Sequence, residues 1–330
     1  MANLALRNPQ FKFIVASATA KSVVCSVTID GTLRYTLIKN LPTITSGTQT
    51  INFDIAELAR DYIEITYQTD YVPQTVSIST LIKSHPSING FGSPIDSASY
   101  TDKGFEAYGT FEEGVNPEVP FRSVPSYLMS KSSSTEFTIL APSGLSGKLP
   151  SITSLNGLIA TNYSTTDTIK TVQGNVCNIK RIDCTKYGNG NKITFINKYG
   201  AQQDLFFFLK KTRSLARTNE GYKSNTITYP SGGATYSVED APNKVFNTQG
   251  KQSYTFSSGY YPEFANQFFE ELLLSEYVWL DPSTINSART STIPVKVKTS
   301  SMSYKTSVND RLIEYTIEFE EAFDYINNIR

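Results

Sequence analysis

The chain has 330 residues, and its 30 Lys and Arg balance its 30 Asp and Glu, so the formal net charge is zero. This length predicts two domains or one domain with large insertions, and the neutral charge argues against DNA or RNA as a main partner because nucleic-acid binders carry a basic surface. No stretch approaches the roughly 20 apolar residues of a membrane span, and the N-terminus does not resemble a signal peptide. We therefore expect no membrane partner and folding in a cytoplasm.

The first strands of the chain are predicted by alternating apolar residues. The alternation runs through residues 23–29 and resumes through residues 33–37, which predicts a hairpin. A two-residue loop would place apolar residues opposite polar ones. We therefore predict a three-residue turn at residues 30–32 with a bulge, which pairs Ile29 with Leu33 and, two residues further along, Val27 with Tyr35.

A short helix is predicted at about residues 54–63, between strands at 11–15 and 75–82. Asp54 is the expected N-cap, and Glu57 three residues later completes a capping box. Strands around one short helix predict an antiparallel β-sandwich for the N-terminal part of the chain.

The middle of the chain, residues 84–190, is rich in Ser, Gly, Pro and Thr, with strand-like segments only at 105–111 and 136–140. A structureless segment of this length is improbable in a compact domain, so irregular β structure with long connections is expected. The change in composition predicts two domains, an N-terminal sandwich at 1–115 and a C-terminal β-rich domain at 116–330. The predicted fold class is mainly β, with antiparallel β-sandwich domains and a few short helices.

The C-terminal part is predicted to combine strands with one amphipathic helix at about 262–274, which has Pro262 at its first position. Its expected strands are residues 193–197, 204–209, 226–229, 253–256, 277–280, 293–298 and 312–319. Gly200 is expected to supply a positive φ in the turn after the first of them. Phe264, Phe268 and Leu272 form one apolar face of the helix. The last strand has one apolar face too, made of Ile313, Tyr315, Ile317 and Phe319, so we predict that the two faces pack together.

Residues that would support catalysis are not marked in the sequence. The single histidine, His85, precedes Pro86 in a loop, and the three cysteines, Cys25, Cys177 and Cys184, lack metal-ligand spacing. Adjacent acids occur at 112–113, 270–271 and 320–321, but neighbouring side chains diverge on a strand or a helix. We expect no catalytic, cofactor or metal site, and no enzyme activity.

A basic segment after the strand at 204–209 is the candidate interface. Periodicity is lost there, so we predict an arm or loop that touches a neighbouring subunit, with charge complementarity setting the register. The candidate residues are the cations Lys210, Lys211, Arg213 and Arg217, the apolar anchors Leu215 and Tyr222, and the acids Glu318, Glu320 and Glu321. The alternative is a solvated loop within one subunit, since exposed ion pairs need no partner to explain them.

Five segments of the chain, residues 33–39, 53–62, 194–208, 271–280 and 315–322, resemble structural proteins of tailed bacteriophages that infect Bacteroidetes hosts. The resemblance implies a virion structural protein, an oligomeric tail component of the distal tail, baseplate or collar, assembled in the bacterial host cytoplasm. Its implied partners are copies of itself and other virion tail proteins. The alternatives are a receptor- or glycan-binding tail adhesin and a polysaccharide hydrolase.

Overall fold

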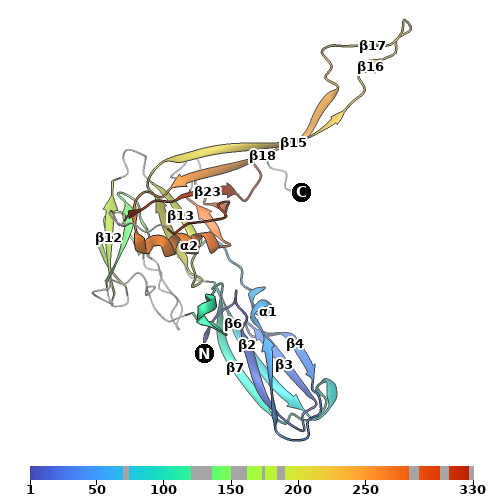
Figure 1. The fold of residues 1–330 in the computed structure, drawn as a ribbon, viewed down its shortest axis with the longest axis vertical. Coiled ribbons are helices and arrows are strands. Elements are labelled where there is room, and N and C mark those ends of the chain that lie inside the picture. Colours follow the sequence, from blue (N-terminus) through green and yellow to red (C-terminus); the bar gives the residue numbers. More distant parts are fainter. Residues whose placement is uncertain are drawn as a thin grey trace.

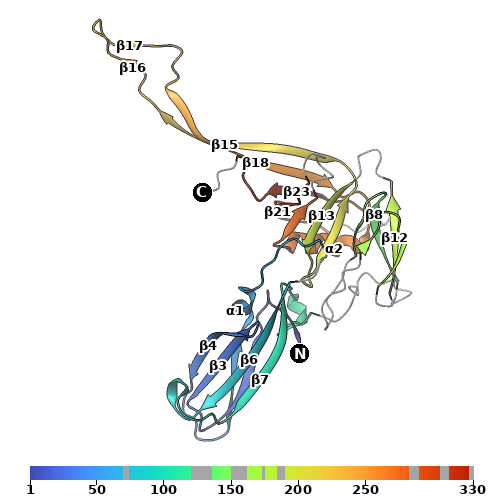
Figure 2. The ribbon, with the colours of Figure 1, turned by 180° about the vertical axis from the view of Figure 1, so that it is seen from behind.

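A computed structural model describes residues 1–69, 74–119, 136–149, 162–172, 175–183, 190–281, 290–304 and 312–326. The fold is mainly β, with several antiparallel sheets and few short helices, which confirms the predicted fold class. The described chain forms an N-terminal sandwich, a C-terminal body and a long ribbon that leaves the body on the side away from the sandwich (Figures 1 and 2).

The N-terminal sandwich contains a five-stranded and a two-stranded sheet. The larger sheet has the order β1 (Asn3–Ala5), β7 (Ser97–Phe105), β6 (Thr75–His85), β3 (Ser22–Ile29) and β4 (Thr32–Asn40). The smaller sheet pairs β2 (Phe11–Ser17) with β5 (Thr48–Asp54). Alternate side chains of β3 and β6, including Val23, Cys25, Val27 and Ile78, are buried in one core with β2 and β5 residues. Period-two patterning thus places one face of each strand in the core.

The turn between β3 and β4 has two residues, not the predicted three. Asp30 and Gly31 both have positive φ, 48° and 78°, as a type I′ turn requires. Ile29 therefore pairs with Thr32, and the predicted pairing of Ile29 with Leu33 is wrong.

The predicted bulge exists, but it lies further along the hairpin. The register shifts between the pairs of Val27 and Thr28, and Val27 then pairs with Tyr35 as predicted. Because a bulge inserts one residue into a strand, it restores the alignment that the short turn had shifted. Tyr35 and Leu37 consequently pack against the sandwich core.

Helix α1 spans Ala56–Arg60 and is shorter than predicted. The capping box is wrong: the N-cap is Ile55, and no side chain caps the helix. Asp54 does accept a hydrogen bond from the Ala56 N–H at 3.0 Å, but it also accepts one from the Gln10 N–H at 2.9 Å. Ile55 is fully buried, so packing rather than the capping signal decides where the helix begins.

Residues 105–111 were predicted as a strand, which is wrong for most of their length. Strand β7 ends at Phe105, and Phe111–Glu113 forms a short 3-10 helix, η2. A second short 3-10 helix, η1, lies at Ile88–Gly90. Apolar periodicity does not predict β7, because its alternating positions include Asp102 and Gly104.

The C-terminal body is built on a seven-stranded sheet. Its order is β14 (Gln202–Phe207), β13 (Asn191–Ile196), β20 (Val278–Leu280), β21 (Ile293–Val297), β23 (Thr316–Glu321), β18 (Asn243–Ser257) and β15 (Lys211–Lys223). The predicted strands of this region are thus present, except that residues 312–319 divide into β22 (Leu312–Ile313) and β23.

The two edge strands of this sheet, β14 and β15, are consecutive in the chain. The Phe208 N–H donates to the Ser258 carbonyl at 3.1 Å, and the Ser257 N–H donates to the Lys210 carbonyl at 3.0 Å. The sheet therefore curls, so that the residues connecting its edge strands, 208–210, hydrogen-bond to residues 257–258 at the end of β18. In the turn before β14, Gly200 has the expected positive φ of 80°.

Four smaller sheets complete the C-terminal part of the described chain. They comprise β8 (Glu136–Pro142) with β12 (Asn175–Ile182) and β11 (Ile169–Val172), β9 (Gly147–Lys148) with β10 (Asn162–Tyr163), β16 (Ile227–Thr228) with β17 (Thr235–Tyr236), and β19 (Tyr261–Pro262) with β22. Strand β8, which the sequence predicted, pairs with β12 in parallel. Arg181 on β12 holds this region together by donating to four backbone carbonyls.

The predicted amphipathic helix is a 3-10 turn, η4 (Glu263–Ala265), followed by α2 (Asn266–Leu274). The prediction that it packs on the C-terminal strand region is confirmed. The Phe269 ring lies 4.9 Å from the Tyr315 ring, and the Tyr315 hydroxyl donates to Asn266 at 2.6 Å. The deepest contact is made by Phe269, which is fully buried, rather than by Phe264, which is 38% exposed.

Two large hydrophobic clusters occupy the sandwich and the body, with a smaller third cluster near their junction. The third consists of Ala5, Phe105, Ala107 and Val119, and Tyr199 from the body packs against it. Residues up to Val119 thus pack with the sandwich. The predicted domain boundary at 115 stays a prediction, because packing alone does not show which part folds independently.

Candidate protein–protein interface

The ribbon of β15 and β18 extends the body sheet far beyond the body (Figure 1). We call residues 216–249 the arm; it holds the distal part of β15, the β16–β17 hairpin and the first part of β18. None of these residues is buried. A bulge between Thr218 and Glu220, opposite Asn247 with its φ of 50°, changes the register within the ribbon.

The arm presents large apolar side chains to solvent. The exposed ones are Tyr222, Ile227, Tyr229, Tyr236, Val238, Val245 and Phe246. Tyr222 and Phe246 pack edge to face at 5.8 Å, which supports the ribbon locally. A two-stranded ribbon is only marginally stable alone, and ordering its backbone costs about 1–2 kcal/mol per residue. An arm of this kind is therefore suited to gain its stability from a partner surface.

The predicted basic segment forms a strand, not the expected segment without periodicity. Lys211, Arg213, Leu215 and Arg217 alternate with small side chains along β15. This is a period-two pattern of large and small residues, which an apolar-only search does not detect. Register places Arg213 beside Tyr254 and Leu215 beside Gln252, so the large residues share the face of the sheet that carries the body core.

Every candidate residue on this strand is exposed, and so is Lys210, which directly precedes it. Strand β15 is also an edge of the seven-stranded sheet, so one row of its backbone groups has no strand beside it. Long exposed edge strands tend to pair with other chains, and Lys and Arg on them limit that tendency. The cations therefore suit two roles, contact with a partner or protection of an edge.

The three predicted acids lie on β23 and are engaged within the chain. Lys298 is 3.0 Å from Glu318, and Lys251 is 3.6 Å from Glu320. The pKa of Lys298 is raised by its hydrogen bond and charge interaction with Glu318. The structure does not show the β15 cations next to these acids, because β18 separates the two strands.

Glu321 is the least exposed of the predicted interface residues, at 6%. It accepts a hydrogen bond from the Tyr254 hydroxyl at 2.5 Å. Its carboxylate therefore has a donor within the chain, and its role at an interface stays a prediction.

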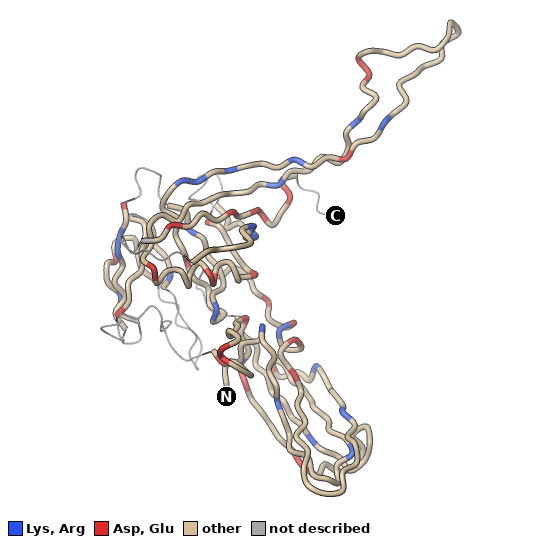
Figure 3. The backbone as a smooth tube through the Cα atoms, in the orientation of Figure 1, with Lys and Arg blue, Asp and Glu red and all other residues tan. Residues whose placement is uncertain are grey.

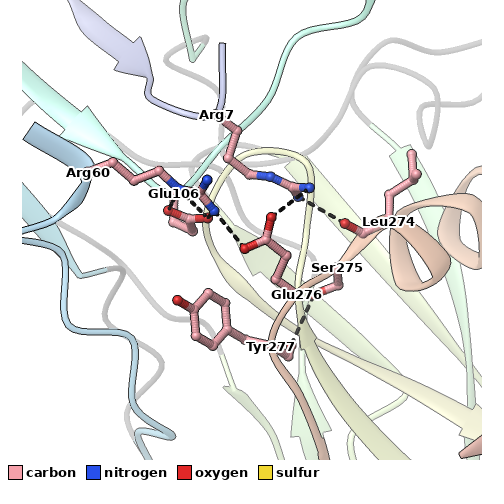
Figure 4. Close-up of polar contacts among 7 residues, drawn as sticks. All are labelled: Arg7, Arg60, Glu106, Leu274, Ser275, Glu276 and Tyr277. Atoms are coloured by element: carbon pink, nitrogen blue, oxygen red, sulfur yellow. Dashed lines mark hydrogen bonds and ion pairs between the residues drawn. The ribbon is translucent and has the colours of Figure 1, made fainter. Parts of the chain in front are cut away.

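A cluster of ion pairs connects the sandwich to the body (Figure 4). Sequence patterns did not predict it. Arg60 of α1 donates to both carboxylate oxygens of Glu106 and, at 2.6 Å, to Glu276. Arg7 meets Glu276 at 3.2 Å and donates to the Leu274 carbonyl at 2.9 Å. Glu276 from the body thus bridges two arginines of the sandwich.

The electrostatics of this cluster follow from its burial. Glu106 is 4% exposed, so the bidentate contact with Arg60 is what compensates the burial of its carboxylate. That hydrogen bond is the main cause that raises the pKa of Arg60. Arg7 also places a cation at the C-terminal end of α2, where the helix dipole favours it. The cluster thus links the sandwich to the body through ion pairs at their junction.

A small cavity of about 110 Å³ lies nearby, at the junction of sandwich and body. Tyr108, Tyr199, Gln267, Glu270 and Glu271 are among its lining residues. Both adjacent acids border it, but their carboxylates meet different partners: Glu270 accepts from the Tyr304 hydroxyl at 2.8 Å and Glu271 from the Lys198 N–H at 3.4 Å. Burial raises the pKa of Tyr108, and the charges of Glu271 and Glu270 raise it further.

His85, Cys25 and Cys177, none of which was predicted to be catalytic, are buried in the structure. His85 is 8% exposed, and its Nδ1 lies 2.9 Å from the Gly92 carbonyl. Cys25 and Cys177 are buried and free, and Cys184 lies outside the described residues. Within the described ranges, no three His, Cys, Asp or Glu side chains gather as a metal site requires, and no helix is long and apolar enough to span a bilayer.

Comparison of the chain with protein-family models, with curated proteins and with solved structures finds no match.

Proposed function

We propose that this chain is a virion structural protein, an oligomeric component of a bacteriophage tail that acts through protein–protein interfaces. The observation that carries the proposal is the arm, which orders 34 residues (216 to 249) without burying any of them in its own chain. A catalytic or small-ligand function does not need such a ribbon, whereas a subunit that grips its neighbours does.

The tail assignment is supported by the places where the resembling segments lie. Arg60 belongs to the segment 53–62, Tyr199 to 194–208 and Glu276 to 271–280, and all three lie at the junction of sandwich and body. Three of the five resembling segments thus meet at this junction, while residues 33–39 lie on β4 and residues 315–322 contain β23. The remaining assignments, a location in the virion after assembly in the host cytoplasm and other tail proteins as partners, rest on that resemblance.

The test removes the arm without disturbing the body. Residues 219–248 are replaced by Asn-Gly, which joins Thr218 to Gln249 where these two residues already pair across the ribbon. Mass photometry of the full chain should show a discrete oligomer, and the shortened chain should be monomeric. Antibody labelling of phage particles should mark the tail. A full chain that stays monomeric at high concentration and is missing from purified particles would refute the proposal.

Glycan binding is a second candidate, favoured by the junction cavity with its two tyrosines, a glutamine and two carboxylates. Aromatic faces beside polar groups are typical of small polar ligand sites. Calorimetric titration with host polysaccharide fragments, with Tyr199→Ala as the binding-deficient variant, tests it. The same fragments, analysed for cleavage products, test the prediction that the chain is not an enzyme.

A further inference from the structure

The end of the arm differs in chemistry from its base. Residues 224–238, which we call the tip, contain no charged side chain, and charges appear only at its borders, from Lys223 and Glu239 (Figure 3). Tyr229, Tyr236 and Val238 are 75%, 72% and 93% exposed. The tip is therefore an uncharged hairpin that holds aromatic and apolar groups in solvent.

A groove opens where the arm leaves the body. It has a volume of about 400 Å³ and lies between residues 290–294 and the segment that follows β23. This segment is attached to the base of the arm, because the Tyr325 N–H donates to the Gly250 carbonyl at 2.7 Å. Phe323 and Tyr325, both more than half exposed, border the groove. We call it the arm-base groove.

Both acids that line the arm-base groove already have partners within the chain. Glu321 accepts from the Tyr254 hydroxyl, and Asp324 lies 3.6 Å from Lys251. The rest of the lining offers hydroxyl groups, aromatic rings and aliphatic groups. These acids repel an anionic occupant, and a cationic one would compete with Lys251 for Asp324, whereas a neutral apolar occupant meets the aromatic and aliphatic groups.

The tip cannot enter the groove of its own chain. Strand β18 runs without interruption from Asn243 in the arm to Ser257 in the body, so the arm is a continuation of the body sheet. Both views show the arm pointing away from the body (Figures 1 and 2). At about 3.3 Å per residue, the roughly 17 residues from the arm base to the turn reach up to roughly 55 Å, which is long enough to meet another molecule.

We propose that the tip of one copy inserts into the arm-base groove of a second copy. The inference rests on the proposed function and adds the two surfaces that meet. The tip is uncharged, the acids of the groove have partners within their own chain, and both surfaces carry aromatic groups. The contact is heterologous, so repeated contacts give a ring or a helical filament. A membrane is a poor occupant for the tip, which has no Lys, Arg, Trp, Phe or Leu.

The test uses two full-length variants that each lose one surface. Tyr229→Ala with Tyr236→Ala removes the tip aromatics, and Ser291→Arg places a charge in the groove at an exposed position where the side chain does not disturb packing. Tyr260→Ala, on a tyrosine 61% exposed outside both surfaces, is the matched control. Far-UV circular dichroism and the thermal transition verify that each variant folds.

Each variant alone should need at least a 100-fold higher concentration than the wild type to assemble, whereas the control assembles normally. An equimolar mixture of the two variants should form 1:1 dimers that do not grow, because only one tip and one groove remain intact in each pair. A wild-type oligomer that either variant leaves unchanged, or a mixture that stays monomeric, overturns the tip-in-groove contact while the structural function stands. A wild type that never assembles, and is missing from particles, refutes the proposed function as well.

Discussion

Replacing Phe269 of α2 with alanine provides the most direct check of how the C-terminal body is packed. Phe269 is fully buried, with a relative exposure of 0%. Its ring centroid lies 4.9 Å from that of Tyr315, 5.3 Å from that of Tyr261 and 6.2 Å from that of Phe207. Truncating a buried Phe costs about 3–5 kcal/mol, and each lost aromatic pair adds about 0.5–1.5 kcal/mol to simple area burial. We expect a loss of about 4–5 kcal/mol in the free energy of unfolding.

The assay is urea denaturation followed by tryptophan fluorescence, because the single tryptophan, Trp279, lies on β20 of the same body. With a slope of about 3 kcal/mol per M, a loss of 4 kcal/mol moves the midpoint by about 1.3 M. Phe264→Ala is the matched control, since Phe264 precedes the same helix and is 38% exposed. Its expected cost is about 1–2 kcal/mol.

Equal shifts for Phe269→Ala and Phe264→Ala would refute this account, since the two residues differ mainly in burial. A shift below about 0.4 M for Phe269→Ala would likewise show that α2 does not cover the sheet through this ring. A lower slope with an unchanged midpoint would instead indicate an altered unfolded state, and the experiment would then be repeated with thermal unfolding, where the same order of effects is expected.

Three further predictions concern charges and thiols. Arg60→Met should destabilise the chain by about 3 kcal/mol in urea denaturation, because it leaves Glu106 buried without its cation; an effect below about 1 kcal/mol would contradict this role. Burial raises the pKa of Cys25 to about 11 and of Cys177 to about 12, so iodoacetamide at pH 8 should modify both thiols in urea but neither in the native chain, as peptide mass mapping would show. The pKa of Asp96 is lowered, chiefly by its hydrogen bond from Ser84, so the stabilisation by its carboxylate is present above the unfolded pKa of about 3.9 and is lost as the pH falls below that value. The difference in stability between wild type and Asp96→Asn should therefore close below about pH 4. A difference that does not change with pH would contradict the assignment.

The sequence by itself determined much of the local structure. Alternating apolar residues marked most strands of the sandwich and the body, and helical spacing marked α2, because side-chain period depends only on backbone geometry. The positive φ at Gly200 was predictable because glycine has no Cβ and adopts this conformation without a steric cost. Apolar periodicity is absent from β15, where large and mostly basic residues alternate with small ones, so this strand was not predicted.

Only the tertiary structure decided which face of a strand is buried. On β2, the alternating Phe11, Phe13 and Val15 are exposed, and Ile14 and Ala16 face the core. Period two identifies two faces but does not say which one meets the second sheet, since that depends on strands distant in the sequence.

The candidate site was likewise divided between the two levels. The sequence marked the basic segment and two of its apolar anchors, yet it did not show that β18 would pair with β15 and carry both beyond the body. Nor did it show that Arg60 would meet Glu276, which is 216 residues away. Such contacts form when packing brings distant elements together, and single charges leave no periodic trace in the chain. Local order therefore came from the sequence, whereas the arm, its groove and the junction came from long-range packing.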